Sequence, residues 1–211
     1  MTAPLILDIN PYAPRGDIIM KAAAILRDDG LIVAPTETRY GLLARHDHRR
    51  ALEKMIKLKG RKAEIPVALF VPSIADISKL GELNHRAEAL AYKYLPGPLT
   101  LVLKAKKDLG PPLAVDGKIG IRYSSSEVIK ALLAVSDFYP TATSANLSGH
   151  EQPVTVDEIA AMLGDSVSLY LNSGPLAGDV STVVDCSGTV PIILREGAIT
   201  KSEIDRFLET A

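Results

Sequence analysis

The 211-residue chain has little of several residue types, and each scarcity excludes a class of protein. Cys186 is the only cysteine, which excludes a disulfide framework and a cysteine-rich metal site and fits a reducing cytosol. Tryptophan is absent and aromatic residues make up only 5% of the chain, which disfavours a surface of aromatic platforms for nucleic-acid bases. The formal net charge of −1 gives no global attraction to nucleic acid or to a membrane, so any basic surface must be local.

Longer signals are missing as well. No apolar run approaches the length of a membrane span, and the first residues show no basic segment followed by an apolar one. We therefore expect a cytoplasmic protein with no signal peptide and no membrane partner. The two standard phosphate-binding patterns, G-x-x-x-x-G-K-[ST] and G-x-G-x-x-G, are also absent, so a nucleotide would have to be bound by another route.

The residues that are present predict one α/β domain over residues 1–211. The chain is 47% hydrophobic, which is enough for one sizeable core. Apolar residues at helical spacing and two capping boxes, Thr155-Val156-Asp157-Glu158 and Thr200-Lys201-Ser202-Glu203, alternate with short β-rich runs. Helices are expected over 17–29, 48–58, 84–94 and 124–135 and behind both capping boxes; strands are expected over 31–34, 40–44, 67–71, 99–103, 118–122, 141–143, 167–171, 181–185 and 191–194. Several strands follow one another directly, which predicts a mixed sheet rather than a purely parallel one.

Two segments have the composition of a polyanion site. Lys59-Gly60-Arg61 places two cations beside a glycine, and Ser144-Ala145-Asn146-Leu147-Ser148-Gly149 gathers small residues, hydroxyls and one amide. Fixed positive charge opposite hydroxyl and backbone N–H donors suits a phosphate-rich ligand. The alternative is that Lys59 and Arg61 only satisfy carbonyl groups at the end of a helix, a common use of cations.

Further polar side chains stand at the ends of apolar strands. Thr36 and Thr38 follow the strand over 31–34, and loops at strand ends are where α/β sheets bind ligands. Arg122 and Arg195 each end an apolar run and need an anionic partner, either a structural carboxylate or a substrate, and Glu196 could be that partner for Arg195.

Other reactive residue types favour plain roles. Cys186 lies in an apolar run and is interpreted as a small buried hydrophobic residue rather than a nucleophile. The four histidines show no metal-ligand spacing, so no metal site is assigned.

Seven ordered motifs, spread over residues 16–200, carry a resemblance to a known family. They are Pro35-Thr36-Glu37-Thr38-Arg39-Tyr40-Gly41-Leu42, Lys59-Gly60-Arg61, Pro96-Gly97-Pro98-Leu99-Thr100, Ile119-Gly120-Ile121-Arg122, Ser144 to Gly149, Ser181-Thr182-Val183-Val184-Asp185 and Leu194-Arg195-Glu196-Gly197. In these motifs the chain resembles the YrdC/YciO-like family, the threonylcarbamoyl-AMP synthases. The resemblance implies a twisted mixed sheet with helices on both faces around a central, positively charged cavity.

The resemblance also implies a reaction and its residues. L-threonine, bicarbonate and ATP would give threonylcarbamoyl-adenylate and pyrophosphate, in the service of threonylcarbamoyladenosine formation on tRNA. ATP would be a substrate accompanied by Mg²⁺, with no tightly bound cofactor, and tRNA, double-stranded RNA or other tRNA-modification proteins would be partners. By motif, the residues that bind L-threonine would be Thr38, Arg122 and Ala142. The residues that bind ATP would be Lys59, Arg61, Ser144, Asn146, Gln152 and Arg195, and Lys59 and Arg61 would also be catalytic.

Four positions depart from the family pattern. Ile65 stands where many members have Asn, Phe70 where they have His, Lys118 where Thr is usual, and Arg39 where an apolar residue is usual. These changes leave open a second hypothesis, a YciO-like protein that binds RNA or nucleotide in the cavity without catalysis.

Overall fold

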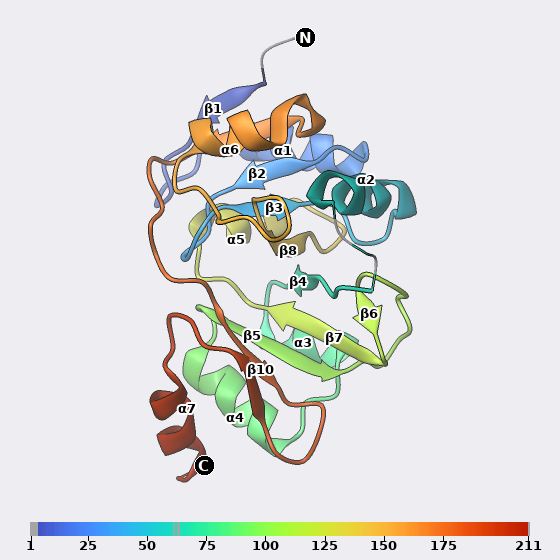
Figure 1. The fold of residues 1–211 in the computed structure, drawn as a ribbon, viewed down its shortest axis with the longest axis vertical. Coiled ribbons are helices and arrows are strands. Elements are labelled where there is room, and N and C mark those ends of the chain that lie inside the picture. The colour runs from blue at the N-terminus through green and yellow to red at the C-terminus, as the bar shows by residue number, and fades with distance from the viewer. Residues whose placement is uncertain (1–3, 61, 63, 211) are drawn as a thin grey trace.

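One mixed β-sheet runs through the computed structural model, which describes residues 4–60, 62 and 64–210 (Figure 1). Its order is β1-β9-β2-β3-β8-β4-β7-β5-β10-β11, and β6 pairs with β7 outside this path. Pairs such as β4 with β7 are parallel and pairs such as β5 with β7 are antiparallel, so the expected mixed sheet is confirmed. The strands are β1 (Ile6–Asp8), β2 (Ile32–Ala34), β3 (Gly41–Leu43), β4 (Ala68–Phe70), β5 (Leu99–Lys104), β6 (Ala114–Val115), β7 (Lys118–Arg122), β8 (Thr141–Ser144), β9 (Leu169–Asn172), β10 (Thr182–Asp185) and β11 (Ile192–Arg195).

The helices begin where the sequence signals predict. Thr155 and Thr200 form the two capping boxes with Glu158 and Glu203, and the side chain of Asn84 accepts a hydrogen bond from the backbone N–H of Ala87. Because these caps satisfy backbone donors that the first turn leaves free, each fixes a helix start. The helices are α1 (Gly16–Arg27), α2 (Arg49–Lys59), α3 (Ile74–Leu80), α4 (His85–Tyr94), α5 (Glu127–Ala134), α6 (Val156–Leu163) and α7 (Lys201–Leu208), with a 3₁₀ turn over Gly164–Ser166.

Helices cover both faces of the sheet around β2. Ile32 and Ala34 point into a core cluster that includes residues of α1 and α5, whereas Leu31 and Val33 point into a larger cluster that includes residues of α2 and α6. Successive residues of a strand face opposite sides of a sheet, so this alternation places the helices on both faces, as expected.

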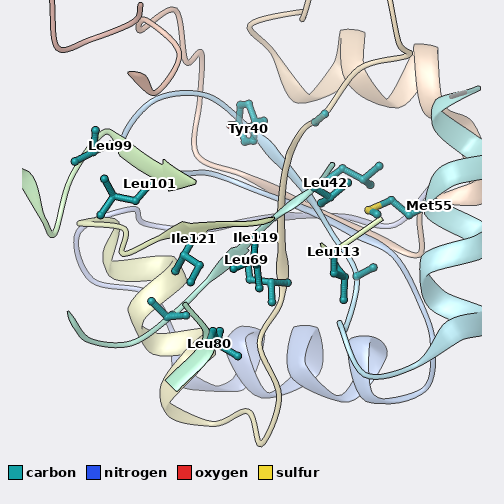
Figure 2. Close-up of a cluster of buried hydrophobic side chains, with 14 of the residues drawn as sticks. Tyr40, Leu42, Met55, Leu69, Leu80, Leu99, Leu101, Leu113, Ile119 and Ile121 are labelled. Carbon is teal, nitrogen blue, oxygen red and sulfur yellow. The ribbon is translucent and has the colours of Figure 1, made fainter. Parts of the chain in front are cut away.

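The region of β4, β7, β5 and β10 is covered differently. Leu69, Leu101, Ile121 and Val184 are paired across these four strands and belong to the core that α3 and α4 close. Figure 2 shows Leu69, Ile119 and Ile121 together, with Leu80 of α3 on one side of them and Leu99 and Leu101 on the other. The alternate residues of the same strands therefore face away from this core, and that opposite face carries the candidate site.

Gly197 lies where a side chain would collide with the backbone beside that face. A Cβ at this position would stand 2.1 Å from the carbonyl oxygen of Val180 and 2.8 Å from the carbonyl carbon of Ser181. The Gly197 N–H also donates to the Thr182 hydroxyl at 3.0 Å, which holds the chain close. Only glycine fits at position 197, because the backbone of Val180 and Ser181 leaves no room for a side chain.

Gly197→Ala is expected to lower the free energy of unfolding by roughly 1–3 kcal/mol, the usual cost of overpacking a well-packed site. Urea unfolding measures this loss. Gly188→Ala is the matched control, because a Cβ at Gly188 would meet nothing within 4 Å. Equal stability of the two variants would show that the connection from β11 to α7 shifts without cost.

Candidate active site

A cavity of about 740 Å³ lies on the face of the sheet that helices leave open. It is floored by β4, β7, β5 and β10 and walled by the loop after β2, the end of β8 and the end of β11. Its lining residues include Thr36, Thr38, Arg39, Tyr40, Gly41, Ala68, Phe70, Thr100, Val102, Lys118, Gly120, Arg122, Ala142, Thr143, Ser144, Gln152, Ser181, Val183, Asp185 and Arg195.

Small residues make the floor hollow. Ala142 pairs with Ala68, a Cβ built on Gly120 would come within 3.1 Å of the Ala68 Cβ, and Val102 pairs with Gly120. A larger residue at Gly120 would fill the trough from below. The strand register thus leaves room for a ligand above Ala68, Gly120 and Ala142.

Arg122 forms one wall and is buried, with 8% of its surface exposed. Its Nη2 donates to the Thr38 hydroxyl at 2.7 Å and lies 3.0 Å from Glu37 Oε1 in an ion pair. Its guanidinium carbon lies 5.5 Å from the centre of the Phe70 ring, a cation–π contact. The sequence required an anionic partner for Arg122, and Glu37 is that partner.

Arg195 contributes a second cation to the cavity lining. Its Nε and Nη2 donate to the backbone carbonyl of Ser181, at 3.1 and 2.8 Å, and Nη2 also donates to the Ser181 hydroxyl. The Ser181 hydroxyl, and not Glu196, is thus the side-chain partner of Arg195. Burial, and then the charge of Arg122, lower the pKa of Arg195, although a guanidinium stays charged in proteins. Two cations that feel each other's charge across one cavity favour an anion between them.

Lys118 and Asp185 stand on the cavity floor as an ion pair, with Nζ 2.8 Å from Oδ2. Burial opposes the ionisation of Asp185, but the hydrogen bonds from Lys118 and Ser187 outweigh it and lower the pKa of Asp185. Asp185 is therefore ionised near neutral pH, and Lys118, which departs from the family pattern, lines the cavity.

Lys59 lies behind the cavity wall rather than among the lining residues. It is 2% exposed, and its ammonium donates to the carbonyl oxygens of Ser144, at 2.6 Å, and Asn146, at 2.9 Å. Gly60 ends α2 in the left-handed conformation, with φ of 60°, which favours glycine. Lys59 thus joins the end of α2 to the 144–149 loop. Arg61 lies outside the described residues.

The 144–149 loop is held by its own side chains. Asn146 Oδ1 accepts from the Ser144 hydroxyl at 2.6 Å, and Asn146 Nδ2 donates to the His150 carbonyl at 2.6 Å. Gln152, which is 7% exposed, donates to the Tyr40 carbonyl at 2.5 Å and lines the cavity with Ser144. Asn146 itself shapes the loop without lining the cavity.

The fold brings together six of the eight predicted site residues that it describes. Thr38, Arg122, Ala142, Ser144, Gln152 and Arg195 line one cavity, whereas Lys59 and Asn146 support its wall. Sequence reasoning gave no role to Ser181, Asp185 or Glu37, although all three lie in quoted motifs. Their position inside those motifs was the one feature of the sequence that could have pointed to these three residues.

Other titratable residues take structural places. Cys186 is 1% exposed, and burial followed by the nearby Asp185 charge raises its pKa to about 12, so the prediction of a small buried residue is confirmed. Within the described residues, no group of three or more His, Cys, Asp or Glu side chains could hold a metal ion. No helix in the same part of the chain is long and apolar enough to cross a membrane.

Comparisons with known proteins find relatives of similar sequence and similar fold. A threonylcarbamoyl-AMP synthase of Bacillus subtilis is 36% identical over 197 residues, which cover 90% of this chain and 56% of that protein. The crystal structure of Pyrococcus abyssi Sua5 complexed with L-threonine has a TM-score of 0.89 at 29% identity and covers 97% of this chain and 61% of its own. Escherichia coli YciO has a TM-score of 0.87 at 26% identity over 95% of this chain and 98% of its own.

The chain spans little more than half the length of the Bacillus synthase, so the comparison concerns one part of that protein. The profile of the Sua5/YciO/YrdC domain, described as "Telomere recombination", matches residues 24–197. Sequence and fold therefore agree, and this chain belongs to the Sua5/YciO/YrdC family.

Proposed function

We propose that this chain is a threonylcarbamoyl-AMP synthase, a nucleotidyltransferase that forms L-threonylcarbamoyladenylate and pyrophosphate from L-threonine, bicarbonate and ATP. One observation carries the proposal: Arg122 and Arg195 line a single cavity of about 740 Å³ together with Thr36, Thr38, Thr100 and Ser181, which carry hydroxyl groups. Such a cavity suits two anionic substrates at once. Relatives named for this activity, and a relative that binds L-threonine, support the choice of substrates.

The amino acid would occupy the part of the cavity near Arg122. The guanidinium would meet the threonine carboxylate, and the Thr38 hydroxyl, already bonded to Arg122 at 2.7 Å, would keep the two groups together. Ala142 lies on β8, which β4 separates from the strand of Arg122, and its small side chain leaves space for the side chain of the substrate.

ATP would occupy the part of the cavity near Ser144, Gln152 and Arg195, and Arg61 is a further residue that we propose for ATP. Lys59 and Asn146 would act on ATP through the 144–149 loop that they hold. Cations and hydroxyl groups are the usual partners of a polyphosphate, and Mg²⁺ would enter bound to the phosphates of ATP.

The reaction asks for positioning and charge neutralisation. The carbamate of threonine, formed with bicarbonate, would attack the α-phosphate, and pyrophosphate would leave. Negative charge grows on the phosphate oxygens in such a transfer, and fixed cations in a partly dry site stabilise it. Lys59 and Arg61 would serve this catalytic purpose, Lys59 by fixing the loop and Arg61 by its charge.

The test is incubation of the protein with ATP, L-threonine and bicarbonate, followed by mass detection of the adenylate and an assay for pyrophosphate. Product is expected only when all three substrates are present. Pyrophosphate release that ignores threonine or bicarbonate would overturn the proposal. ATP binding without any release would favour the alternative of a nucleotide-binding protein without turnover.

RNA remains a proposed partner. The solvent face of α2 carries Arg49, Arg50, Lys54 and Lys57, with Glu53 among them, which is a local concentration of positive charge in a chain of net charge −1. Binding of tRNA through such a face should weaken steeply with salt, because released counterions drive it. Undetectable or salt-independent binding would exclude this partner.

Phe70→His is expected to sharpen the preference for threonine over valine by roughly tenfold, because a ring nitrogen can bond the substrate hydroxyl, which valine lacks, where a phenyl ring cannot. Phe70 is 1% exposed, packs in the α1–α5 core and lies under Arg122. Adenylate formation across a panel of amino acids measures the change. Phe70→Leu is the control, since it removes the ring without adding a donor. The unmodified protein could already prefer threonine strongly, with no change in Phe70→His. That result would identify Phe70 as a core packing residue without a role in substrate selection.

A further inference from the structure

Glu37 is the buried carboxylate of the first motif, and nothing above gives it a part in the reaction. Its Oε1 lies 3.0 Å from Arg122 Nη2, and its side chain is 13% exposed. Its Oε2 accepts a hydrogen bond from the Ser124 hydroxyl. Glu37 itself is not among the lining residues of the cavity, so it stands behind Arg122 as seen from a ligand.

The support of Glu37 continues into α5. The Ser124 hydroxyl, which is 1% exposed, accepts from the backbone N–H of Ser126 at 3.1 Å, and Ser126 is the residue that precedes α5. The Ser126 hydroxyl donates back to the Pro35 carbonyl at 3.2 Å. The loop after β2, the end of β7 and the start of α5 are thus joined through one carboxylate.

Two buried polar atoms of the described residues lack a hydrogen bond, and both belong to this pair: Glu37 Oε1 and Arg122 Nε. The ion pair has the distance of a salt bridge without the paired geometry of a side-on Arg–carboxylate contact. A pair optimised only for stability would satisfy these atoms, since an unsatisfied buried polar group is costly. The imperfect pairing suits an arginine held for a second anion.

We propose that Glu37 is a positioning residue, which orients the Arg122 guanidinium toward the carboxylate of the amino-acid substrate before that substrate arrives. The identity of the anion rests on the proposed function. Arg122 has a long side chain with many rotamers. The Thr38 hydroxyl, the Phe70 ring and the Glu37 carboxylate each contact its guanidinium. Among these three, only Glu37 carries the charge that compensates a buried cation while the cavity is empty.

The positioning role predicts a selective effect. Replacing Glu37 by Gln keeps the shape of the side chain and removes its charge. The Arg122 side chain should then remain at the cavity wall but lose its fixed orientation. Binding of the amino acid should suffer, because the charge-assisted bond to its carboxylate depends on that direction. Binding of ATP, which other residues contact, should change little.

The experiment measures the threonine KM of adenylate formation, the ATP Kd, and the order of the Arg122 Nε–H group by ¹⁵N NMR relaxation. Glu37→Gln is expected to raise the threonine KM roughly tenfold or more, to leave the ATP Kd within about twofold, and to make the Arg122 side chain mobile. Glu37→Asp should give an intermediate KM. If Glu37→Gln does not fold, Ser124→Ala removes the support of Glu37 more gently and should act in the same direction.

Asp47→Asn is the matched control, because Asp47 pairs with the buried Arg45 at 2.7 Å outside the cavity lining. It should lower stability and leave the threonine KM and Arg122 order unchanged. Unchanged threonine KM and unchanged Arg122 order in Glu37→Gln would overturn the positioning role, and so would an equal loss of ATP affinity. If the unmodified protein makes no adenylate, the proposed function fails, and the NMR comparison still decides whether Glu37 holds Arg122.

Discussion

Arg122→Ala raises the threonine requirement of adenylate formation roughly ten- to a hundredfold and leaves the ATP Kd nearly unchanged, if Arg122 meets the amino-acid carboxylate. A lost charge-assisted hydrogen bond of about 1.5–3 kcal/mol gives this range. Arg122 bonds Thr38 and Arg195 bonds Ser181 in the same cavity, and the proposed function assigns the first arginine to the amino acid and the second to ATP. Initial rates over a threonine series at saturating ATP, with a separate ATP titration, measure the effect.

The ion pair with Glu37 makes this substitution costly for a second reason. Removing Arg122 alone leaves a buried carboxylate without its cation, which lowers stability by about 3–5 kcal/mol. The double variant Glu37→Met/Arg122→Met removes both charges and should recover much of that loss without recovering threonine use. Arg122→Lys keeps a charge but not the planar donors, so it should rescue stability better than activity.

Three outcomes are distinct. Equal loss of threonine and ATP binding would show that the division of the cavity is wrong. Loss of stability with unchanged ligand binding would leave Arg122 as a structural partner of Glu37 only. A loss of threonine use that persists in a stable double variant would assign the carboxylate to Arg122.

The fold was predictable because its signals are local. The capping boxes at Thr155 and Thr200 and the alternation of Leu99, Leu101 and Leu103 with Thr100 and Val102 can be recognised without any partner strand. Two of the missed elements, β1 and β6, lack such signals, whereas α3 has one that was not recognised, since the Ser73 side chain accepts a hydrogen bond from the backbone N–H of Asp76. β6 has two residues, α3 has seven with Ile77 and Leu80 as its buried positions, and β1 is a strand of three residues with no buried position.

The site was only partly predictable, because contacts between distant segments are not written in spacing. Arg122 needed an anion, yet the choice of Glu37 follows from the packing of the loop after β2 against the end of β7. Lys59 was singled out correctly as unusual, but its burial against Ser144 and Asn146 depends on how α2 meets the loop after β8. Phe70 was noticed as a departure, and its place under Arg122 required the pairing of β4 with β7.

Lys59→Met is expected to lower both stability and activity, because Lys59 fixes the cavity wall from behind. Methionine keeps the length of the side chain and removes the donors that reach Ser144 and Asn146. Hydrogen bonds from a charged group contribute about 1.5–3 kcal/mol, so we expect the loss of those from the buried Lys59 ammonium to lower the unfolding free energy by about 2–3 kcal/mol. Ser144 lines the cavity, so a displaced loop should also reduce adenylate formation roughly a hundredfold.

Lys57→Met is the matched control, because Lys57 is an exposed lysine in the last turn of the same helix. It should change neither urea unfolding nor adenylate formation. The pair of measurements separates two roles for Lys59. A variant that keeps full stability and loses only ATP affinity would show that the ammonium acts on the nucleotide directly. Loss of stability together with activity, and an ATP Kd that weakens no more than the threonine KM, is the result expected of a residue that holds the loop for both substrates.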